Sequence, residues 1–469
     1  MAQTTEKMLN GKSALKWFFC LIVPAIVYFA LPIDGKTLTH EMAMFLVVTI
    51  LMVCIWGFEL VNDTATGLVL PVLYMALCGV PGKIAYNNWL GDVPNIVIGG
   101  FIFCKILQDT GLGKRVGLGC MKLMGGSFIG TVWGLMLAIY IINPLVPAVT
   151  GKGVIFCAIV ISLCESLDFK KQSREATALM LVAFLAVTSS KNGFLTGGGD
   201  LVIGMSLVDG VMGLKTSWLQ YAGWNLLPAT VFTVMSVAIV VVLLPSKVNK
   251  EELRRALYAR YAELGPMRRD EKTATVLLIV TLIVLMTDKW HGLTPGMGLV
   301  FLAAVSFLPG VSLMDGQKIK EVNFCPIFFI MGCMAIGSAG NYLKVTQWMA
   351  DSTFGYMEGL GIYGASVCSY VVGVIGNFIL TPLAATASFS APLAELGVQM
   401  GLEPRIMYLS FKYGFDNYLF PYEYAVLLIF YGFGYIHFGS MVKVLAARMI
   451  LTVPFLLAVA VPWWQWIMK

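Results

Sequence analysis

Long apolar stretches separated by short polar or charged segments make up nearly the whole chain. A helix needs about 20 apolar residues to cross the hydrocarbon core of a bilayer. The pattern therefore predicts an all-α polytopic membrane protein with about 11 transmembrane helices. The predicted spans cover residues 14–32, 41–61, 64–80, 94–110, 178–205, 218–245, 274–289, 296–309, 322–340, 405–436 and 440–466. Between two of them, residues 113–124 are basic and amphipathic, which is typical of a helix at the cytoplasmic interface.

Two further apolar regions are interrupted by proline. Residues 126–164 are broken at Pro144 and Pro147, and residues 362–398 at Pro382. Such a break at membrane depth is tolerated only inside protein or beside a wet cavity. Lysine and arginine flank the first region on both sides, which places both of its ends in the cytoplasm, whereas the second region lacks this excess. We predict two re-entrant hairpins that enter from opposite faces; two full spans are the alternative for the first.

Two of the predicted spans are also broken. The first contains Thr196-Gly197-Gly198-Gly199-Asp200, and each glycine inside a helix costs about 1 kcal/mol relative to alanine. The second contains Phe420-Pro421-Tyr422-Glu423-Tyr424. Both segments are predicted to be unwound.

The two halves of the chain repeat the same plan. Eight lysines and arginines in residues 246–273 mark a cytoplasmic linker between them. Pro147 and Thr150 correspond to Pro382 and Thr386, which indicates an inverted-topology repeat. Matching interruptions in two such halves mark the substrate site of a transporter.

Composition supports the membrane assignment and excludes other classes. Hydrophobic residues make up 58% of the chain and charged residues 12%, against about 25% charged in soluble domains. The net charge of +6 lies in loops and indicates topology, not a nucleic-acid partner. The ten cysteines contain no CxxC motif, so no metal site is predicted. Lysines before the first span place the N-terminus in the cytoplasm and leave the C-terminus outside.

Several local motifs resemble those of the divalent-anion:sodium symporter family, the dicarboxylate, citrate and sulfate carriers. The resemblance rests on Glu59 with Thr64-Ala65-Thr66, on Thr196-Gly197, Ser217-Trp218-Leu219-Gln220 and Leu227-Pro228, and on Tyr431-Gly432-Phe433-Gly434-Tyr435. It implies a homodimer in a bacterial inner membrane. Each protomer would have a scaffold domain and a transport domain that moves as an elevator, with substrate held between the two hairpin tips.

This resemblance implies a domain organisation. Residues 1–40 form the N-terminal tail and first span, and residues 246–273 the linker. The first repeat, 41–245, has scaffold helices in 41–124 and hairpin and transport helices in 125–245. The second repeat, 274–469, has scaffold helices in 274–340 and hairpin and transport helices in 362–469.

The hairpin tips depart from the family pattern, which is a Ser-Asn-Thr triplet shared between substrate and sodium. Here the tips read Ala148-Val149-Thr150 and Ala384-Ala385-Thr386. A threonine hydroxyl beside the free N–H groups of a helix N-terminus suits a carboxylate, and a simple helix cap is the alternative. The predicted substrate-binding residues are Ala148, Val149, Thr150, Gly151, Lys152, Thr196, Gly197, Pro382, Ala384, Ala385, Thr386 and Pro421.

Charged residues within the predicted spans are expensive and are candidates for function. We expect the ammonium of Lys152 or Lys191 to replace a sodium ion, unless it only snorkels or pairs with a structural acid. Asp200 and Glu423 could couple to protons or pair with these lysines. The predicted ion-coupling or charge-compensating residues are Lys152, Lys191, Gly199, Asp200, Asp416 and Glu423, with Asn192 and Lys412 on the same broken spans.

The expected function is secondary active transport of a small organic anion, a di- or tricarboxylate, by an elevator mechanism. Exchange or proton coupling is favoured, and a sodium-coupled dicarboxylate or sulfate symporter is the alternative. No cofactor is expected beyond sodium or a proton as coupling ion. A channel or intramembrane enzyme is a more distant alternative. The two breaks differ in flanking charge and imply entry from opposite faces, which argues against a channel, and the sequence has no HExxH motif and no evident Ser/His pair, which argues against an enzyme.

Overall fold

The computed structural model describes residues 11–58, 60–246, 248–357 and 359–468. Glu59, which contributes to the family resemblance, lies outside them. Within these ranges the secondary structure is helical, without a strand. Among the described residues, five helices are long and apolar enough to cross a membrane, or six if one bent pair is a single span, and five further apolar helices are shorter. The fold class is as predicted, and the total of about 11 spans stays a prediction.

The first part of the chain follows the predicted spans closely. Its helices are α2 (Gly11–Ala30), α3 (His40–Gly57), α4 (Asp63–Cys78), the short α5 (Gly82–Ala85) and η2 (Asn87–Leu90), then α6 (Asp92–Thr110) and α7 (Leu112–Leu123). The chain bends by 70° between α6 and α7. Gly111 makes this bend possible because its φ of 74° is a left-handed conformation that costs glycine little. The helix α7 is the predicted basic, amphipathic helix.

The first interrupted region forms two long arms around a proline-containing tip. The arms are α8 (Phe128–Ile142), which continues into η3 (Asn143–Leu145), and α9 (Val149–Ser166). Each arm is 18 residues long, enough for a span. Length therefore permits both alternatives for this region, and the re-entrant hairpin stays a prediction.

The first broken span is unwound over a longer stretch than the glycine run. The helix α10 (Arg174–Ser190) ends before η4 (Lys191–Gly193) and η5 (Leu195–Gly197), and α11 (Gly199–Met212) follows. The first half is completed by α12 (Trp218–Leu243), whose start is fixed by a capping box between Ser217 and Gln220.

The basic linker between the halves contains a helix, α13 (Lys250–Ala262), that packs on α7. The ammonium of Lys122 lies 4.4 Å from the ring centroid of Tyr261. The guanidinium of Arg115 donates to Glu271 at 2.9 and 3.1 Å. Burial raises the pKa of Glu271, but its hydrogen bonds from Arg115 and the Arg268 amide outweigh burial and hold the pKa below its ordinary value.

The second half repeats this order. Its helices are α14 (Arg269–Met286), α15 (Asp288–His291), α16 (Pro295–Val305), η6 (Lys318–Glu321), α17 (Cys325–Tyr342), α18 (Val345–Met357), α19 (Ile362–Ile379), α20 (Pro382–Gln399), α21 (Pro404–Phe415), η7 (Pro421–Glu423), α22 (Ala425–Gly432), α23 (Phe438–Phe455), η8 (Leu456–Ala460) and α24 (Val461–Ile467). The helix α18 follows α17 as α7 follows α6, and it lies within the segment 341–361 that we interpreted as a linker.

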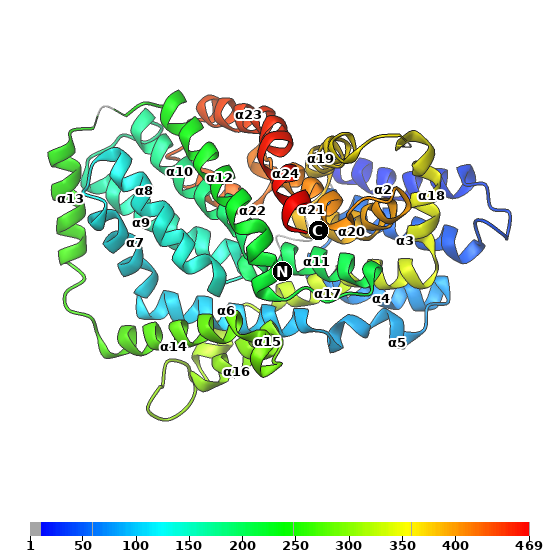
Figure 1. The fold of residues 1–469 in the computed structure, drawn as a ribbon, viewed down its shortest axis with the longest axis horizontal. Helices are drawn as coiled ribbons and strands as arrows, with labels where there is room; N and C mark the ends of the chain where they lie inside the picture. Colours follow the sequence, from blue (N-terminus) through cyan, green and yellow to red (C-terminus); the bar gives the residue numbers. More distant parts are fainter. Residues whose placement is uncertain (1–10, 59, 247, 358, 469) are drawn as a thin grey trace.

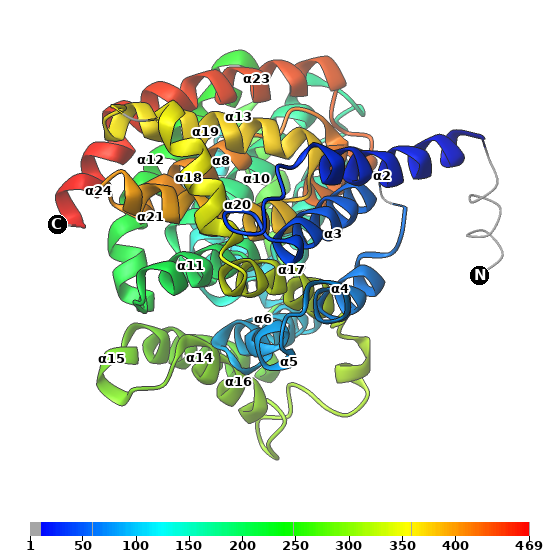
Figure 2. The same ribbon diagram turned by 90° about the vertical axis from the view of Figure 1, so that its right-hand side faces the viewer.

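Each broken span crosses from its own hairpin to the hairpin of the other repeat. In the first repeat, α10 packs on α8 and α9, whereas α11 packs on α20. In the second, α21 packs on α19 and α20, whereas α22 packs on α9. The two hairpins lie on opposite sides of the molecule, with α11 between them (Figures 1 and 2). The unwound segments are therefore the crossing points between two helical bundles, in accordance with an inverted repeat.

Candidate functional site

Four buried charged side chains meet where the two broken spans cross. Lys191 of η4 lies 2.6 Å from Asp200 and 3.1 Å from Asp416. Lys412 of α21 lies 2.8 Å from Asp416 and also contacts Asp200. Each lysine thus bridges an acid of the first repeat and an acid of the second. We call these four residues the inter-repeat quartet. Their side chains are at most 5% exposed.

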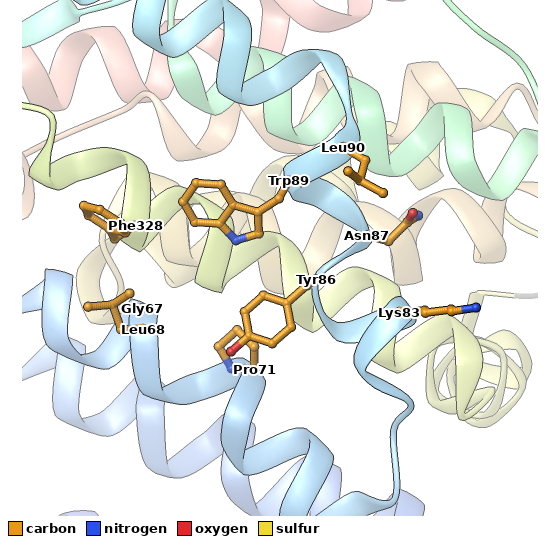
Figure 3. A pocket seen from close by; sticks show the side chains of 9 residues that line it. All are labelled: Gly67, Leu68, Pro71, Lys83, Tyr86, Asn87, Trp89, Leu90 and Phe328. Atoms are coloured by element: carbon orange, nitrogen blue, oxygen red, sulfur yellow. The ribbon is translucent and has the colours of Figure 1, made fainter.

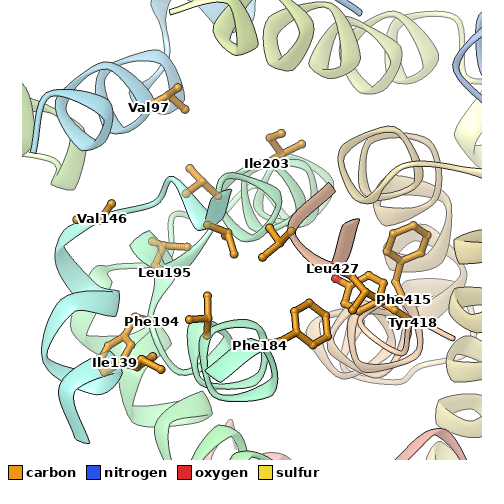
Figure 4. Close-up of a cluster of buried hydrophobic side chains, with 14 of the residues drawn as sticks. Val97, Ile139, Val146, Phe184, Phe194, Leu195, Ile203, Phe415, Tyr418 and Leu427 are labelled. Atoms are coloured by element: carbon orange, nitrogen blue, oxygen red, sulfur yellow. The ribbon is translucent and has the colours of Figure 1, made fainter. Parts of the chain in front are cut away.

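The surroundings of the quartet are apolar, which explains why its charges are paired. Figure 4 shows a cluster of buried apolar side chains from the same core, among them Phe184, Leu195 and Ile203. Burying an ion away from water costs several kcal/mol unless an opposite charge and further hydrogen bonds compensate. Here two positive and two negative groups alternate, so the quartet is neutral as a unit.

Hydrogen bonds from both repeats hold Asp416 in place. Asn192 donates its side-chain amide to one Asp416 carboxylate oxygen at 2.9 Å, and the Tyr418 hydroxyl donates to the other at 2.9 Å. The carboxylate is therefore bound by ammonium, amide and hydroxyl donors together. A buried carboxylate needs such hydrogen-bond donors and opposite charges to offset its loss of hydration.

Arg448 is a buried cation that our sequence reasoning missed. It lies on α23 with 0% exposure and donates to the main-chain oxygen of Asp416 at 2.7 Å. It also donates to Ser189 at 3.1 Å and Ser236 at 3.0 Å, and its guanidinium lies 4.6 Å from the Phe232 ring centroid. A buried arginine in the middle of a predicted span was the available signal, since a charge at that depth is costly.

The first hairpin tip is joined to the first unwound segment by three side chains. Lys152 donates to the main-chain oxygen of Gly197 at 2.7 Å, Thr196 donates to that of Pro144 at 2.5 Å, and Asn143 donates to Ser190. Lys152 is 0% exposed. Among the described residues its ammonium has no ion-pair partner, and Gly197 provides its one hydrogen-bond acceptor. An ammonium has three donors, so two remain available to a ligand.

The second tip contacts the second unwound segment through Glu423. This carboxylate accepts from the Asn377 side chain at 2.6 Å and from the Leu419 and Phe420 amides at 3.1 and 2.9 Å. Glu423 is thus bound by neutral donors, whereas Asp200 is bound by lysines. The hydroxyl of Thr386 is fully buried and has no partner among the described residues.

The other predicted binding residues lie at the two helix starts and in the unwound segments. Thr150 is exposed, in contrast to buried Thr386. The first-turn amides of α9 and α20 have no acceptor within their own helices, as at any helix N-terminus. These starts carry Ala148, Val149 and Gly151 at the first tip and Pro382, Ala384 and Ala385 at the second, while Gly199 begins α11 and Pro421 begins η7. The structure joins each tip to its own unwound segment, and the quartet joins the two segments to each other.

Comparison with known proteins assigns the chain to a family. Residues 12–469 match the model of the sodium:sulfate symporter transmembrane region. Dicarboxylate transporter 1 of spinach chloroplasts is 21% identical over 78% of this chain and 68% of its own length. The citrate/succinate antiporter of Escherichia coli is 23% identical over 76% of this chain and 74% of its own length.

A solved structure has a similar fold. It is that of MtrF from Neisseria gonorrhoeae, which represents a class of antimetabolite efflux pumps; the TM-score is 0.50 and the identity 15%, over 96% of this chain and 94% of that one. Together with the helical fold and the full-length family match, these similarities identify an integral membrane transporter, not an enzyme. The chain belongs to the sodium:sulfate symporter, or divalent-anion:sodium symporter, family.

Proposed function

We propose that this protein is a secondary active transporter of a small organic anion, a di- or tricarboxylate, and that it works without sodium, as an exchanger or by proton coupling. One observation carries the proposal: Lys152 is a fully buried ammonium without an ion-pair partner among the described residues, at the tip of the first hairpin. A buried, unneutralised cation favours an anion beside it.

The chemistry around Lys152 suits a carboxylate. Two of its donors are available, and the first-turn amides of α9 add the positive end of a helix dipole. The names of two relatives point to the same substrate class, because they are a dicarboxylate transporter and a citrate/succinate antiporter. A second carboxylate of the substrate would bind the first-turn amides of α20 and the free Thr386 hydroxyl.

We expect independence from sodium because lysine ammoniums, in a chain that lacks intact Ser-Asn-Thr triplets, bind the oxygen atoms that a sodium ion would need. Backbone and carboxylate oxygens are the ligands that a hard cation requires, and here lysine ammoniums already occupy them. Lys152 binds the Gly197 carbonyl oxygen, and Lys191 and Lys412 bind Asp200 and Asp416. The fixed ammoniums would then supply the positive charge that a coupled ion supplies elsewhere in the family.

The mechanism we propose is an elevator movement within a homodimer. The two bundles that exchange their broken spans share the quartet, so the hairpins and unwound segments would move as one body against the scaffold helices. Ionic contacts confined to the moving body would remain intact during such a movement.

Counterflow in proteoliposomes tests the proposal. The purified protein is reconstituted, loaded with unlabelled succinate, and supplied with radiolabelled succinate outside, in sodium or in potassium buffer. We expect equal uptake in both buffers, stimulation by internal substrate, and competition by citrate or succinate. Uptake that needs sodium, or competition by sulfate alone, would favour a sodium-coupled dicarboxylate or sulfate symporter. Uptake without stimulation by internal substrate would favour a channel.

A further inference from the structure

Glu423 is a buried carboxylate that is bound by neutral donors alone among the described residues. It lies in η7, in the second unwound segment, and is 4% exposed. An asparagine side chain and two main-chain amides donate to it, and no described cation forms an ion pair with it. The two other buried carboxylates of the broken spans, Asp200 and Asp416, each bind two lysines. Among these three acids, Glu423 therefore differs in having no fixed positive charge beside it.

The described elements around η7 supply no cation either. Besides Glu423, the titratable side chains on η7 and on α19 and α22, which pack against it, are a thiol and four phenols: Cys368, Tyr363, Tyr370, Tyr422 and Tyr431. Tyr418 and Tyr424, which precede and follow η7 in the chain, are phenols as well. These groups are uncharged at neutral pH. Burial among neutral groups favours a carboxylate that has bound a proton or a mobile cation.

The hydrogen bonds of Glu423 suit a proton better than a metal ion. N–H groups lie against both carboxylate oxygens, at 2.6 and 3.1 Å from one and 2.9 Å from the other. A hard metal ion needs several oxygen ligands, and N–H groups at these oxygens would repel it. The Oδ1 atom of Asn377 is buried without a hydrogen-bond partner among the described residues. When Glu423 takes up a proton and becomes a donor, a half-turn of the Asn377 amide presents this oxygen as the acceptor.

A cavity elsewhere in the molecule offers no comparable acid. It has a volume of about 680 Å³ and is formed by α4, α5, η2 and the start of α17 (Figure 3). The described residues that line it include no carboxylate. Its one charged lining side chain, Lys83, is exposed and extends away from Trp89 and Phe328. A proton-binding carboxylate is therefore available at the second hairpin tip and not at this cavity.

Protonation of Glu423 matches the buried charge around the tips to that of a dianion. We call the two hairpins, the two broken spans and α23 the transport region. Its buried charged residues are four cations and three carboxylates: Lys152, Lys191, Lys412, Arg448, Asp200, Asp416 and Glu423. With Glu423 protonated the transport region carries two positive charges, which a dicarboxylate neutralises. With Glu423 ionised the loaded region would keep one negative charge, which is costly to bury at membrane depth.

We propose that Glu423 binds the proton that accompanies the substrate. This inference rests on the proposed function and assigns its coupling residue. Glu423 takes up one proton from the solvent when a dicarboxylate dianion binds, and it releases the proton on the other side when the dianion leaves. In exchange, each substrate carries its proton, so no net charge moves. In net uptake, the empty transport region returns with Glu423 ionised and one positive charge, so each cycle brings in one negative charge.

Calorimetric titration of the purified full-length protein with succinate tests the proton uptake directly. The titration is repeated in buffers of different ionisation enthalpy between about pH 7 and about pH 9, where both succinate carboxyls are ionised because an ordinary carboxyl has a pKa of about 4.3. We expect uptake that rises toward about one proton per bound succinate as the pH increases, since more of the free protein then has Glu423 ionised. In Glu423→Gln, succinate should bind without proton uptake.

Succinate counterflow in proteoliposomes, with equal pH on both sides, gives the second measurement. In the unchanged protein the rate should fall several-fold from about pH 7 to about pH 9, because the protonated form of Glu423 is the competent one. Glu423→Gln imitates the protonated, neutral state, so its remaining counterflow should change less than about twofold over this range. An acidic external medium should drive net succinate accumulation by the unchanged protein and not by this variant.

The matched control is Glu395→Gln. Glu395 lies on α20 of the second hairpin but is partly exposed. This variant should keep both the proton uptake and the pH dependence of the unchanged protein.

Succinate binding and counterflow without proton uptake by the unchanged protein would overturn the assignment of Glu423 and leave the proposed function intact. Proton uptake or a pH dependence that persists in Glu423→Gln would also overturn it, and would assign the proton to another group such as Lys152. Absence of both succinate binding and counterflow at every pH would overturn the proposed function together with this inference.

Discussion

The ammonium of Lys191 lies 3.1 Å from the carboxylate of Asp416, and this contact joins the unwound segment of one repeat to that of the other. Lys191 also binds Asp200 of its own repeat, and Lys412 makes the reciprocal pair of contacts. Two spans that are interrupted in the middle would leave unpaired backbone and charge inside the bilayer if each stood alone. Their mutual charge compensation makes the interruption tolerable.

Lys191→Met should destabilise the fold strongly, because Lys412 is then the one ion-pair partner left to Asp200 and Asp416 among the described residues. Breaking a buried ionic contact from one side costs about 3–5 kcal/mol. The double variant Lys191→Met/Asp200→Leu removes one charge of each sign and leaves the Lys412–Asp416 pair, 2.8 Å apart, intact. We expect the thermal unfolding midpoint of this double variant, measured in detergent, to return most of the way to that of the unchanged protein. Additive losses in the double variant would contradict a mutually compensated quartet.

Lys152→Met should strongly reduce transport at low substrate concentration while largely retaining the fold. The substitution removes one hydrogen bond to the Gly197 oxygen and also an unneutralised buried charge, so the net change in unfolding free energy should stay within about 2 kcal/mol. Loss of a charge-assisted bond to substrate, about 1.5–3 kcal/mol, should lower substrate affinity roughly 10- to 100-fold.

The control for this variant is Lys171→Met, because Lys171 is exposed and lies 5.6 Å from the Tyr435 ring centroid. Its uptake in the succinate counterflow assay should match that of the unchanged protein. If Lys152→Met keeps normal uptake, or loses uptake only together with its unfolding midpoint, Lys152 has no role in substrate binding.

The sequence predicted those features that depend on local chemistry. Proline and glycine interrupt helices wherever they stand, so the breaks near Pro144, Pro382, Gly197 and Pro421 were visible in the chain. The unwinding extends back to Lys191 for a tertiary reason: the side chain of Lys191 binds acids on two other elements.

The exchange of partners between the repeats was not visible in the sequence. Hydropathy indicates that a segment is buried, but it does not say which segment it packs against. The packing of α11 on α20 and of α22 on α9 depends on side-chain contacts between segments that are distant in the sequence. The role of Lys412 was left open for the same reason. Arg448 was missed because its partners, an Asp416 main-chain oxygen and two serine hydroxyls, carry no charge pattern along the chain.

Arg448→Lys should destabilise the fold although it conserves the charge. A lysine lacks the planar set of donors that lets Arg448 bind Asp416, Ser189 and Ser236 together. Each buried group left unpaired costs about 1–3 kcal/mol. Lys443→Ala, an exposed position on the same helix, should change the unfolding free energy by less than about 0.5 kcal/mol. Equal unfolding midpoints for the two variants would contradict this role of Arg448.

The contact between Arg115 and Glu271 should make the linker sensitive to acid. The pKa of Glu271 in the folded protein lies below its ordinary value, because its hydrogen bonds outweigh burial. Its contribution to stability is therefore present above the ordinary pKa of about 4.3 and is lost as the pH falls through the folded-state pKa. Proteolysis of the linker by an acid-active protease, measured from about pH 7 down to about pH 3, should increase below about pH 4.3. Glu271→Gln should be cleaved more readily at pH 7 and show less change with pH; an unchanged pH profile would rule out Glu271 as the cause.

Two glycines on α11 should respond oppositely to alanine. At Gly204 a Cβ atom would collide with the ring and hydroxyl of Tyr408 on α21, so Gly204→Ala should cost about 1–3 kcal/mol of unfolding free energy through overpacking. At Gly210 a Cβ atom meets nothing within 4 Å, so Gly210→Ala should gain up to about 1 kcal/mol from helix propensity alone. Tyr408→Leu in the Gly204→Ala background should restore the unfolding midpoint, because leucine lacks the ring and hydroxyl atoms that collide with the alanine Cβ atom. Gly204 and Tyr408 belong to different repeats, so this rescue would show that α11 of the first repeat packs against α21 of the second. Equal effects of the two alanine substitutions on the unfolding midpoint would contradict that packing.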